Sequence, residues 1–312
     1  MSIATPSRSI ALVRLALGAL VCMAFATSPT ASHAASLDDY MNQRGPEPTT
    51  TFHYGPGPFQ VAEFFRPAGA APFPVAILIH GGCWLNRLQG LPQFRALAGA
   101  LQAQGVAVWN IDYRGVDAPD GGYPGTYQDV AASLATLARQ AGPLQLDLDR
   151  VVAIGHSAGA QLALWAAARP RIPSTSPLYS NDPLRIAHVV AVGALADLRG
   201  DSSFIAQTCG IDVSSLTGAP STTRPDVFAD TSPADMLPVD TDIALVNGDD
   251  DTIAPPALAK RFAAVARGKG MNVSVVTVPD AGHFDEVDPG SPAWARIDAI
   301  VLRMLKMPAN RQ

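Results

Sequence analysis

The sequence predicts an α/β fold with an open, mostly parallel central sheet flanked by helices. Short runs of Val, Ile, Leu and Ala alternate along the chain with longer amphipathic stretches. Several of these runs are almost continuously apolar, which is typical of strands that are buried on both faces. Strands that alternate with helices in this way form βαβ units and therefore parallel sheets.

The individual elements follow from this pattern. The expected strands are 59–65, 74–80, 106–111, 151–156, 188–194, 243–247 and 273–278. The expected helices are 91–104, 127–140, 158–168, 256–267 and 292–304. Helix ends carry local signals, because Gly105 and Gly142 follow the first two helices, and Ser291 with Pro292 opens the last one.

The segment 199–237 interrupts this alternation of predicted strands and helices. It is dominated by Ser, Thr, Pro, Gly and Asp and has no clear period. A loop of this length is usually functional, and open α/β sheets bind ligands at the edge where this segment is expected. We therefore expect an insertion loop over the active site. The alternative is a surface excursion with short helices.

Composition and charge narrow the class of protein. With 48% hydrophobic and 16% charged residues, the chain has enough apolar material for a sizeable core and too little charge for a disordered chain. Its net charge of −5 provides no basic footprint for nucleic acid or an anionic membrane. We therefore expect a globular protein with no nucleic-acid partner.

The N-terminus has the pattern of an export signal. Arg8 and Arg14 supply positive charge, and residues 10–27 are mostly apolar. Ser32 and Ala34 then place small residues at positions −3 and −1 of a cut after Ala34. The apolar run is short for a membrane span, although an uncleaved anchor is the alternative.

These features predict three regions. Residues 1–34 are expected to be a signal peptide, so the mature protein would be exported to the periplasm or secreted, with no stable membrane insertion. Residues 35–58 are rich in Pro, Gly and Thr and are predicted to be a flexible lead-in. Residues 59–312 are predicted to form one catalytic domain.

The motif G-H-S-A-G at residues 155–159 carries the strongest chemical signal. It directly follows an apolar run and directly precedes a helical pattern, which is the strand–turn–helix context of a nucleophile elbow. On such a turn the Ser157 hydroxyl would project above the sheet. The N–H of Ala158, at the start of the helix, would point at a developing oxyanion.

The motif H-G-G-C-W at residues 80–84 follows an earlier strand. Gly81 and Gly82 would let backbone N–H groups come close to a substrate and complete an oxyanion hole. A strand-ending turn with a buried His and Trp is the alternative. We expect His80 to organise this loop, and Cys83 and Trp84 to line the substrate pocket.

An acid and a base are expected on two later loops. Asp249, Asp250 and Asp251 follow the strand 243–247, and charge alone does not choose among them or exclude a solvated acidic turn or a cation site. A further rival acid, Asp197, follows the preceding strand. Of the six histidines, only His283 lies on a late loop after a strand. The order Ser, Asp, His is the one expected for hydrolases with this elbow.

Through these motifs the chain resembles the α/β-hydrolase superfamily, in particular the esterase/lipase and arylformamidase-like group with HGGxW before a GHSAG elbow. The resemblance extends from about residue 59 to the C-terminus and includes the segment 110–114 after the third core strand. It implies the α/β-hydrolase fold. It also selects Asp251, which follows the glycine of a G-x-x-D-x-x-[VA]-P loop, as the acid.

The same resemblance implies a mechanism. Gly81, Gly82 and Ala158 would be the oxyanion donors, while Cys83 replaces a third glycine found in hormone-sensitive-lipase-like enzymes and leaves its own N–H open as a donor. We expect a serine hydrolase that cleaves small carboxylic esters through an acyl-enzyme, with no metal and no cofactor. The alternatives are an arylformamidase-type amide hydrolase and a non-catalytic binding protein of the same fold.

Two cysteines remain after the expected signal peptide. Cys83 lies in the glycine loop and Cys209 lies in the long insertion. In an oxidising compartment they can pair, which would tie the insertion to the glycine loop. Two buried free thiols are the alternative, and the sequence does not choose between them.

Overall fold

The computed structural model describes residues 1–4, 34–88 and 90–307. The chain divides into two units, Met1–His33 and Ala34–Gln312. Residues 5–33, which make up most of the predicted signal peptide, lie outside the described residues. All helices and strands discussed below belong to the second unit.

The second unit contains one eight-stranded sheet in the order β1-β2-β4-β3-β5-β6-β7-β8. β2 pairs antiparallel with β1 on one side and with β4 on the other, and all pairings among β3 to β8 are parallel. This arrangement confirms the predicted α/β-hydrolase fold. The strands are β1 (Thr50–His53), β2 (Val61–Phe65), β3 (Phe73–Ile79), β4 (Ala107–Ile111), β5 (Leu146–His156), β6 (His188–Val192), β7 (Asp242–Gly248) and β8 (Val273–Val278).

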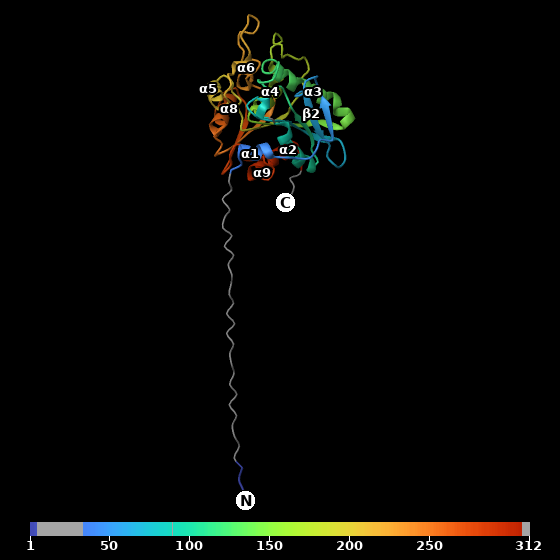
Figure 1. Cartoon of the computed structure of the whole chain (residues 1–312), viewed down its shortest axis with the longest axis vertical. Coiled ribbons are helices and arrows are strands. Elements are labelled where there is room, and N and C mark those ends of the chain that lie inside the picture. Colours follow the sequence, from blue (N-terminus) through green and yellow to red (C-terminus); the bar gives the residue numbers. More distant parts are fainter. Residues whose placement is uncertain (5–33, 89, 308–312) are drawn as a thin grey trace. The chain divides into compact units, whose positions relative to one another are not determined.

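Helices cover both faces of the sheet, as Figure 1 shows. One layer contains α3 (Gly125–Leu144), α4 (Ala158–Ala168) and α8 (Pro256–Gly268). The other contains α1 (Leu37–Asn42), α2 (Leu91–Ala103) and α9 (Pro292–Met304). Alternate residues of β3 enter the two cores, because side chains of a strand point to opposite faces in turn. The sequence of a strand that is buried on both faces is therefore almost continuously apolar.

The segment 35–58, expected to be a flexible lead-in, contains two ordered elements in the structure. In α1, the side chain of Ser36 accepts the N–H of Asp39 and the side chain of Asp39 accepts the N–H of Ser36, which forms a capping box. β1 pairs with β2 at the edge of the sheet. Its mostly exposed, polar residues have no continuous apolar run, so the hydrophobic pattern did not reveal it.

The insertion 199–237 forms three short helices, α5 (Ser202–Cys209), α6 (Ser214–Thr217) and α7 (Pro233–Met236). These helices are too short to produce a recognisable period. Within the part of the chain that the structure describes, no helix is both long and apolar enough to cross a bilayer.

Candidate active site

Ser157 occupies the sharp turn between β5 and α4. Its backbone has φ 54° and ψ −121°, a conformation that is strained for a residue with a side chain. The N–H of Ser157 donates to the carbonyl of Val192 at 2.8 Å, which fixes the turn to the neighbouring strand. A Cβ on Gly155 would lie 2.2 Å from the carbonyl oxygen of Gly159, so the two arms of the turn approach as closely as expected for an elbow.

His283 and Asp251 meet at the carboxyl edge of the same sheet. Nδ1 of His283 lies 2.7 Å from Oδ2 of Asp251, and both side chains are buried. The other carboxylate oxygen accepts the N–H groups of Ile253 and Ala254 at 2.8 and 2.7 Å. These bonds orient the carboxylate toward the imidazole.

The structure separates the three adjacent aspartates. Asp249 and Asp250 are exposed, whereas Asp251 is buried. The rival Asp197 accepts the N–H of Gly200 at 2.7 Å, and burial raises its pKa. Among the hydrogen bonds of the described residues, Asp251 is the only one of these four aspartates that is bonded to the imidazole of His283.

A cavity of about 220 Å³ opens onto Ser157 and His283. Its wall is largely apolar, which is typical of a small-molecule site with a few polar groups. The residues that line it are Leu37, Tyr40, Gly82, Cys83, Leu88, His156, Ser157, Thr208, Ile253, His283 and Phe284.

The glycine loop lies beside Ser157. Gly82 lines the cavity, and a Cβ on Gly81 would lie 2.9 Å from Cβ of Ser157. Ala158 follows Ser157 as the first residue of α4. The three predicted donor residues therefore lie close to Ser157, although Gly81 and Ala158 do not line the cavity.

The side chain of His80 contacts two residues that follow β4. Its ring stacks on Tyr113 with centroids 4.5 Å apart, and its Nε2 lies 3.1 Å from Oδ1 of Asp112. The hydroxyl of Tyr113 donates to the carbonyl of His80 at 2.9 Å. These contacts agree with the expected organising role.

The structure corrects the prediction for Trp84. Cys83 lines the cavity as expected, but Trp84 is fully buried in the core and is absent from the cavity wall. Its indole N–H donates to Oε1 of Gln161 at 3.1 Å. Burial of a large aromatic ring is most favourable when its N–H also has a hydrogen-bond partner, and the core provides both.

Cys83 and Cys209 form a disulfide, with Cα atoms 5.4 Å apart across 126 residues of sequence. The bond links the glycine loop to the end of α5. Thr208, the neighbour of Cys209, also lines the cavity. The pairing that the sequence left open is therefore present, and it brings part of the insertion to the site.

Sequence reasoning missed the wall formed by α1. Leu37 and Tyr40 of this helix line the cavity, and the ring of Tyr40 stacks on Phe284 with centroids 5.4 Å apart. The capping box at Ser36 is a signal that could have revealed the helix. Nothing local in the sequence indicates that the helix docks against the loop of His283.

Three buried titratable groups adjoin one another at the cavity, and two of them line it. His156, His283 and Glu286 place possible ligand atoms within 4.8 Å of one another, which is the only such metal-binding geometry among the described residues. However, Nε2 of His156 lies 3.0 Å from the carbonyl oxygen of His283, and Nδ1 of His283 is bonded to Asp251. The donor set therefore fits a hydrogen-bonded network better than a metal centre.

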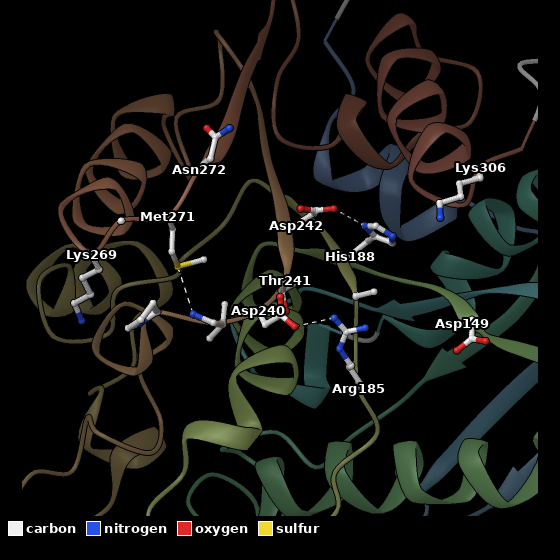
Figure 2. A pocket seen from close by; sticks show the side chains of 14 residues that line it. Asp149, Arg185, His188, Asp240, Thr241, Asp242, Lys269, Met271, Asn272 and Lys306 are labelled. Atoms are coloured by element: carbon white, nitrogen blue, oxygen red, sulfur yellow. Dashed lines mark hydrogen bonds and ion pairs between the residues drawn. The ribbon is translucent and has the colours of Figure 1, made fainter.

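A second, larger pocket of about 590 Å³ lies where β6 and β7 begin, at the opposite edge of the sheet. Figure 2 shows two side-chain pairs in this pocket: Arg185 lies 2.8 Å from Asp240, and His188 lies 3.3 Å from Asp242. None of the predicted site residues lines this pocket.

Solved structures with a similar fold include several esterases. Esterase B from Lactobacillus rhamnosis in an inhibited form is 23% identical, with a TM-score of 0.71, and the match covers 86% of this chain and 89% of that chain. A truncated carbohydrate esterase from gut microbiota is 18% identical, with a TM-score of 0.68 and coverage of 84% and 100%.

The esterase Est2 from Thermogutta terrifontis with bound propionate is 17% identical, with a TM-score of 0.60 and coverage of 81% and 92%. At these identities the likeness establishes the fold. No curated protein gives a significant sequence match. The BD-FAE family model matches residues 63–265, which include the glycine loop, the elbow and the acid loop. The chain therefore belongs to the BD-FAE family.

Proposed function

We propose that this protein is a serine esterase that hydrolyses small carboxylic esters through an acyl-enzyme. One observation carries the proposal: Ser157, on a strained elbow, shares a cavity with His283, whose imidazole is bonded to the buried Asp251. This combination matches a nucleophile, a general base and an orienting acid.

In the proposed reaction, His283 takes the proton of the Ser157 hydroxyl as the oxygen attacks the ester carbonyl carbon. The tetrahedral intermediate collapses, and His283 gives the proton to the departing alcohol. Water then attacks the acyl-enzyme with His283 again as base, which releases a carboxylic acid and restores Ser157. Asp251 holds the imidazole in the required tautomer and stabilises its protonated form.

The oxyanion would be stabilised by backbone N–H groups. Gly81, Gly82 and Ala158 lie close to Ser157 and are the proposed donors. Donors that are fixed before the reaction stabilise the developing charge without reorganisation, and one such donor lowers the barrier by about 3 kcal/mol in other enzymes.

The cavity favours a short apolar group on the substrate. Its volume of about 220 Å³ is small, and Leu37, Leu88, Ile253 and Phe284 make most of its wall apolar. Structural neighbours have been solved with propionate, with butyrate and with a tributyrin phosphonate inhibitor. These names support esters of short-chain acids as the substrate class.

The central test is labelling of the purified protein with a fluorophosphonate probe beside Ser157→Ala. We expect the wild type to label and the variant not to, and hydrolysis of p-nitrophenyl butyrate to fall on the order of 10⁴-fold or more in the variant. A folded wild-type protein that neither labels nor hydrolyses esters would contradict the proposal and favour a binding role for the fold.

We also propose that the protein is exported and cleaved after Ala34. A disulfide is expected in an oxidising compartment, and this chain has one. The new first residue would be Ala35, whose nitrogen lies 3.0 Å from Oδ1 of Asp285. Intact mass of the protein recovered from the periplasm or medium tests the cut; a mass that retains residues 1–34 would contradict it.

A further inference from the structure

Glu286 is a buried carboxyl group that the proposed mechanism does not use. It lies in η3 (Asp285–Val287), directly after the loop of His283, and its side chain is fully buried. Oε1 accepts a hydrogen bond of 2.5 Å from the N–H of Gly248. Gly248 ends β7 and opens the loop that carries Asp251. One side chain therefore connects the two loops that carry the proposed acid and base.

The second oxygen of this carboxyl group is enclosed by the site. Oε2 lies 3.9 Å from Nε2 of His156 and has no hydrogen-bond partner among the described residues. Gly193 packs against it with φ 53°, and a Cβ there would lie 2.8 Å from Oε2 and 2.9 Å from Cε1 of His283. The backbone at this position therefore approaches both side chains as only glycine allows.

The surroundings favour a neutral carboxyl group. Burial raises the pKa of Glu286 well above its usual value, and the charges of Asp251 and Asp285 raise it further. Burial also lowers the pKa of His156, so this neighbour does not supply a positive charge. A neutral Glu286 can accept the N–H of Gly248 without competing with Asp251 for the imidazolium of His283.

We infer that Glu286 is a positioning residue, whose carboxyl group holds the Asp251 loop against the His283 loop and thereby sets their hydrogen bond. The inference rests on the proposed function, because that pair is the acid and base of the mechanism. The two loops are also joined by a main-chain bond from Asp250 to Ala281 at 3.1 Å. Loss of the side chain should therefore loosen the pair rather than unfold the protein.

The test compares Glu286→Gln and Glu286→Leu with the wild type. Gln keeps an acceptor oxygen and carries no charge, whereas Leu keeps the bulk and removes the acceptor. Steady-state hydrolysis of p-nitrophenyl butyrate is measured across pH, with thermal melts to confirm folding. Asp298→Asn is the matched control, because Asp298 is also a carboxyl group whose pKa burial raises and which is bonded to an amide, Gln104, but it lies in α9 away from the cavity.

We expect Glu286→Gln and Asp298→Asn to keep kcat within about threefold, with an unchanged acidic limb of the pH profile. We expect Glu286→Leu to lower kcat about 10- to 100-fold at similar KM, as is common when a group that orients a reacting residue is lost. Glu286 does not line the cavity, so binding should be spared.

Two results would overturn the inference. If Glu286→Gln loses as much kcat as Glu286→Leu, or if its acidic limb moves by about one pH unit, then the charge of the carboxylate matters rather than its position. If folded Glu286→Leu matches the wild type in kcat, the residue positions nothing. Failure of the proposed function is a separate result, because the wild type itself would then be inactive and would not label.

Discussion

The two edges of the sheet place their paired polar side chains in opposite environments. At the carboxyl edge, the side chains of His283 and Asp251 are 5% and 0% exposed and border a small, largely apolar cavity. At the amino edge, the side chains of Arg185 and Asp240 are 69% and 93% exposed beside a pocket more than twice as large. Water weakens interactions between exposed polar groups, so exposed ion pairs contribute little, whereas a buried pair is screened much less. The proposed acid–base pair therefore lies at the smaller of these two pockets.

The sharpest test of this contrast lies within the acid loop. Asp251→Asn should lower kcat/KM on the order of 10⁴-fold, because an amide at this position favours the wrong tautomer of His283. Asp250→Asn is the matched control, since Asp250 is exposed and has no bond to the imidazole. Ester hydrolysis by both variants checks the prediction. Equal losses in the two variants would mean that the buried hydrogen bond is not the source of the effect.

The disulfide should matter next most. Replacing Cys83 and Cys209 together by Ser should lower the free energy of unfolding by about 2–5 kcal/mol, because the crosslink closes a long loop. Urea unfolding of the variant and the wild type measures this loss. We also expect lower kcat, since Cys83 adjoins Gly82 in the cavity wall. An unchanged midpoint of unfolding would contradict the stabilising role.

The α1 wall should control substrate length. Leu37→Ala enlarges an apolar wall, so the ratio of kcat/KM for p-nitrophenyl octanoate to that for the acetate should rise about tenfold, the effect of one or two methylene groups in a pocket. Val265→Ala is a suitable control, because Val265 is a partly exposed apolar residue of α8 that does not line the cavity. A ratio that stays unchanged in Leu37→Ala would show that α1 does not contact the substrate.

The free energy of unfolding should depend on pH through His156, which lies at the carboxyl edge of the sheet. Burial lowers its pKa well below 6.5, so below about pH 6.5 the unfolded chain binds a proton that the folded chain excludes. Stability therefore falls as the pH falls, by up to about 1.4 kcal/mol per pH unit from this group. His156→Gln keeps a donor for the carbonyl of His283 and should show a weaker decline between pH 6.5 and 4.5 in urea unfolding. Parallel declines would refute this assignment.

The smallest effect is expected at the amino edge. Asp240→Ala removes an exposed ion pair and should change the free energy of unfolding by less than about 1 kcal/mol. Ester hydrolysis should stay within about twofold of the wild type. A tenfold loss of activity would break the comparison, because it would tie the larger pocket to the reaction.

Much of the architecture was predictable from the sequence. The helices 158–168 and 292–304 and the strand 273–278 have the predicted bounds. The motifs at 80–84 and 155–159 lie on the predicted turns beside one cavity. These features depend on periodicity and on residues close together in the chain, which a sequence displays directly.

The elements that were missed share a physical cause. β1 is a polar edge strand, and α5, α6 and α7 are shorter than the pattern needed to detect them. The side chain of Trp84 points into the core, where it contacts Gln161 and other residues that lie far away in the sequence. Such contacts exist only after the chain has folded, so no local pattern reports them.

By itself, the sequence determined the fold class, the elbow of Ser157, the glycine loop and the late position of His283, because each arises from neighbouring residues. The family motif selected Asp251, and the tertiary structure shows its bond to the imidazole. Only the tertiary structure decided that Cys83 pairs with Cys209 and that α1 lines the cavity. These outcomes depend on distances between segments that are remote in the chain. The packing of the two helical layers on the sheet sets those distances.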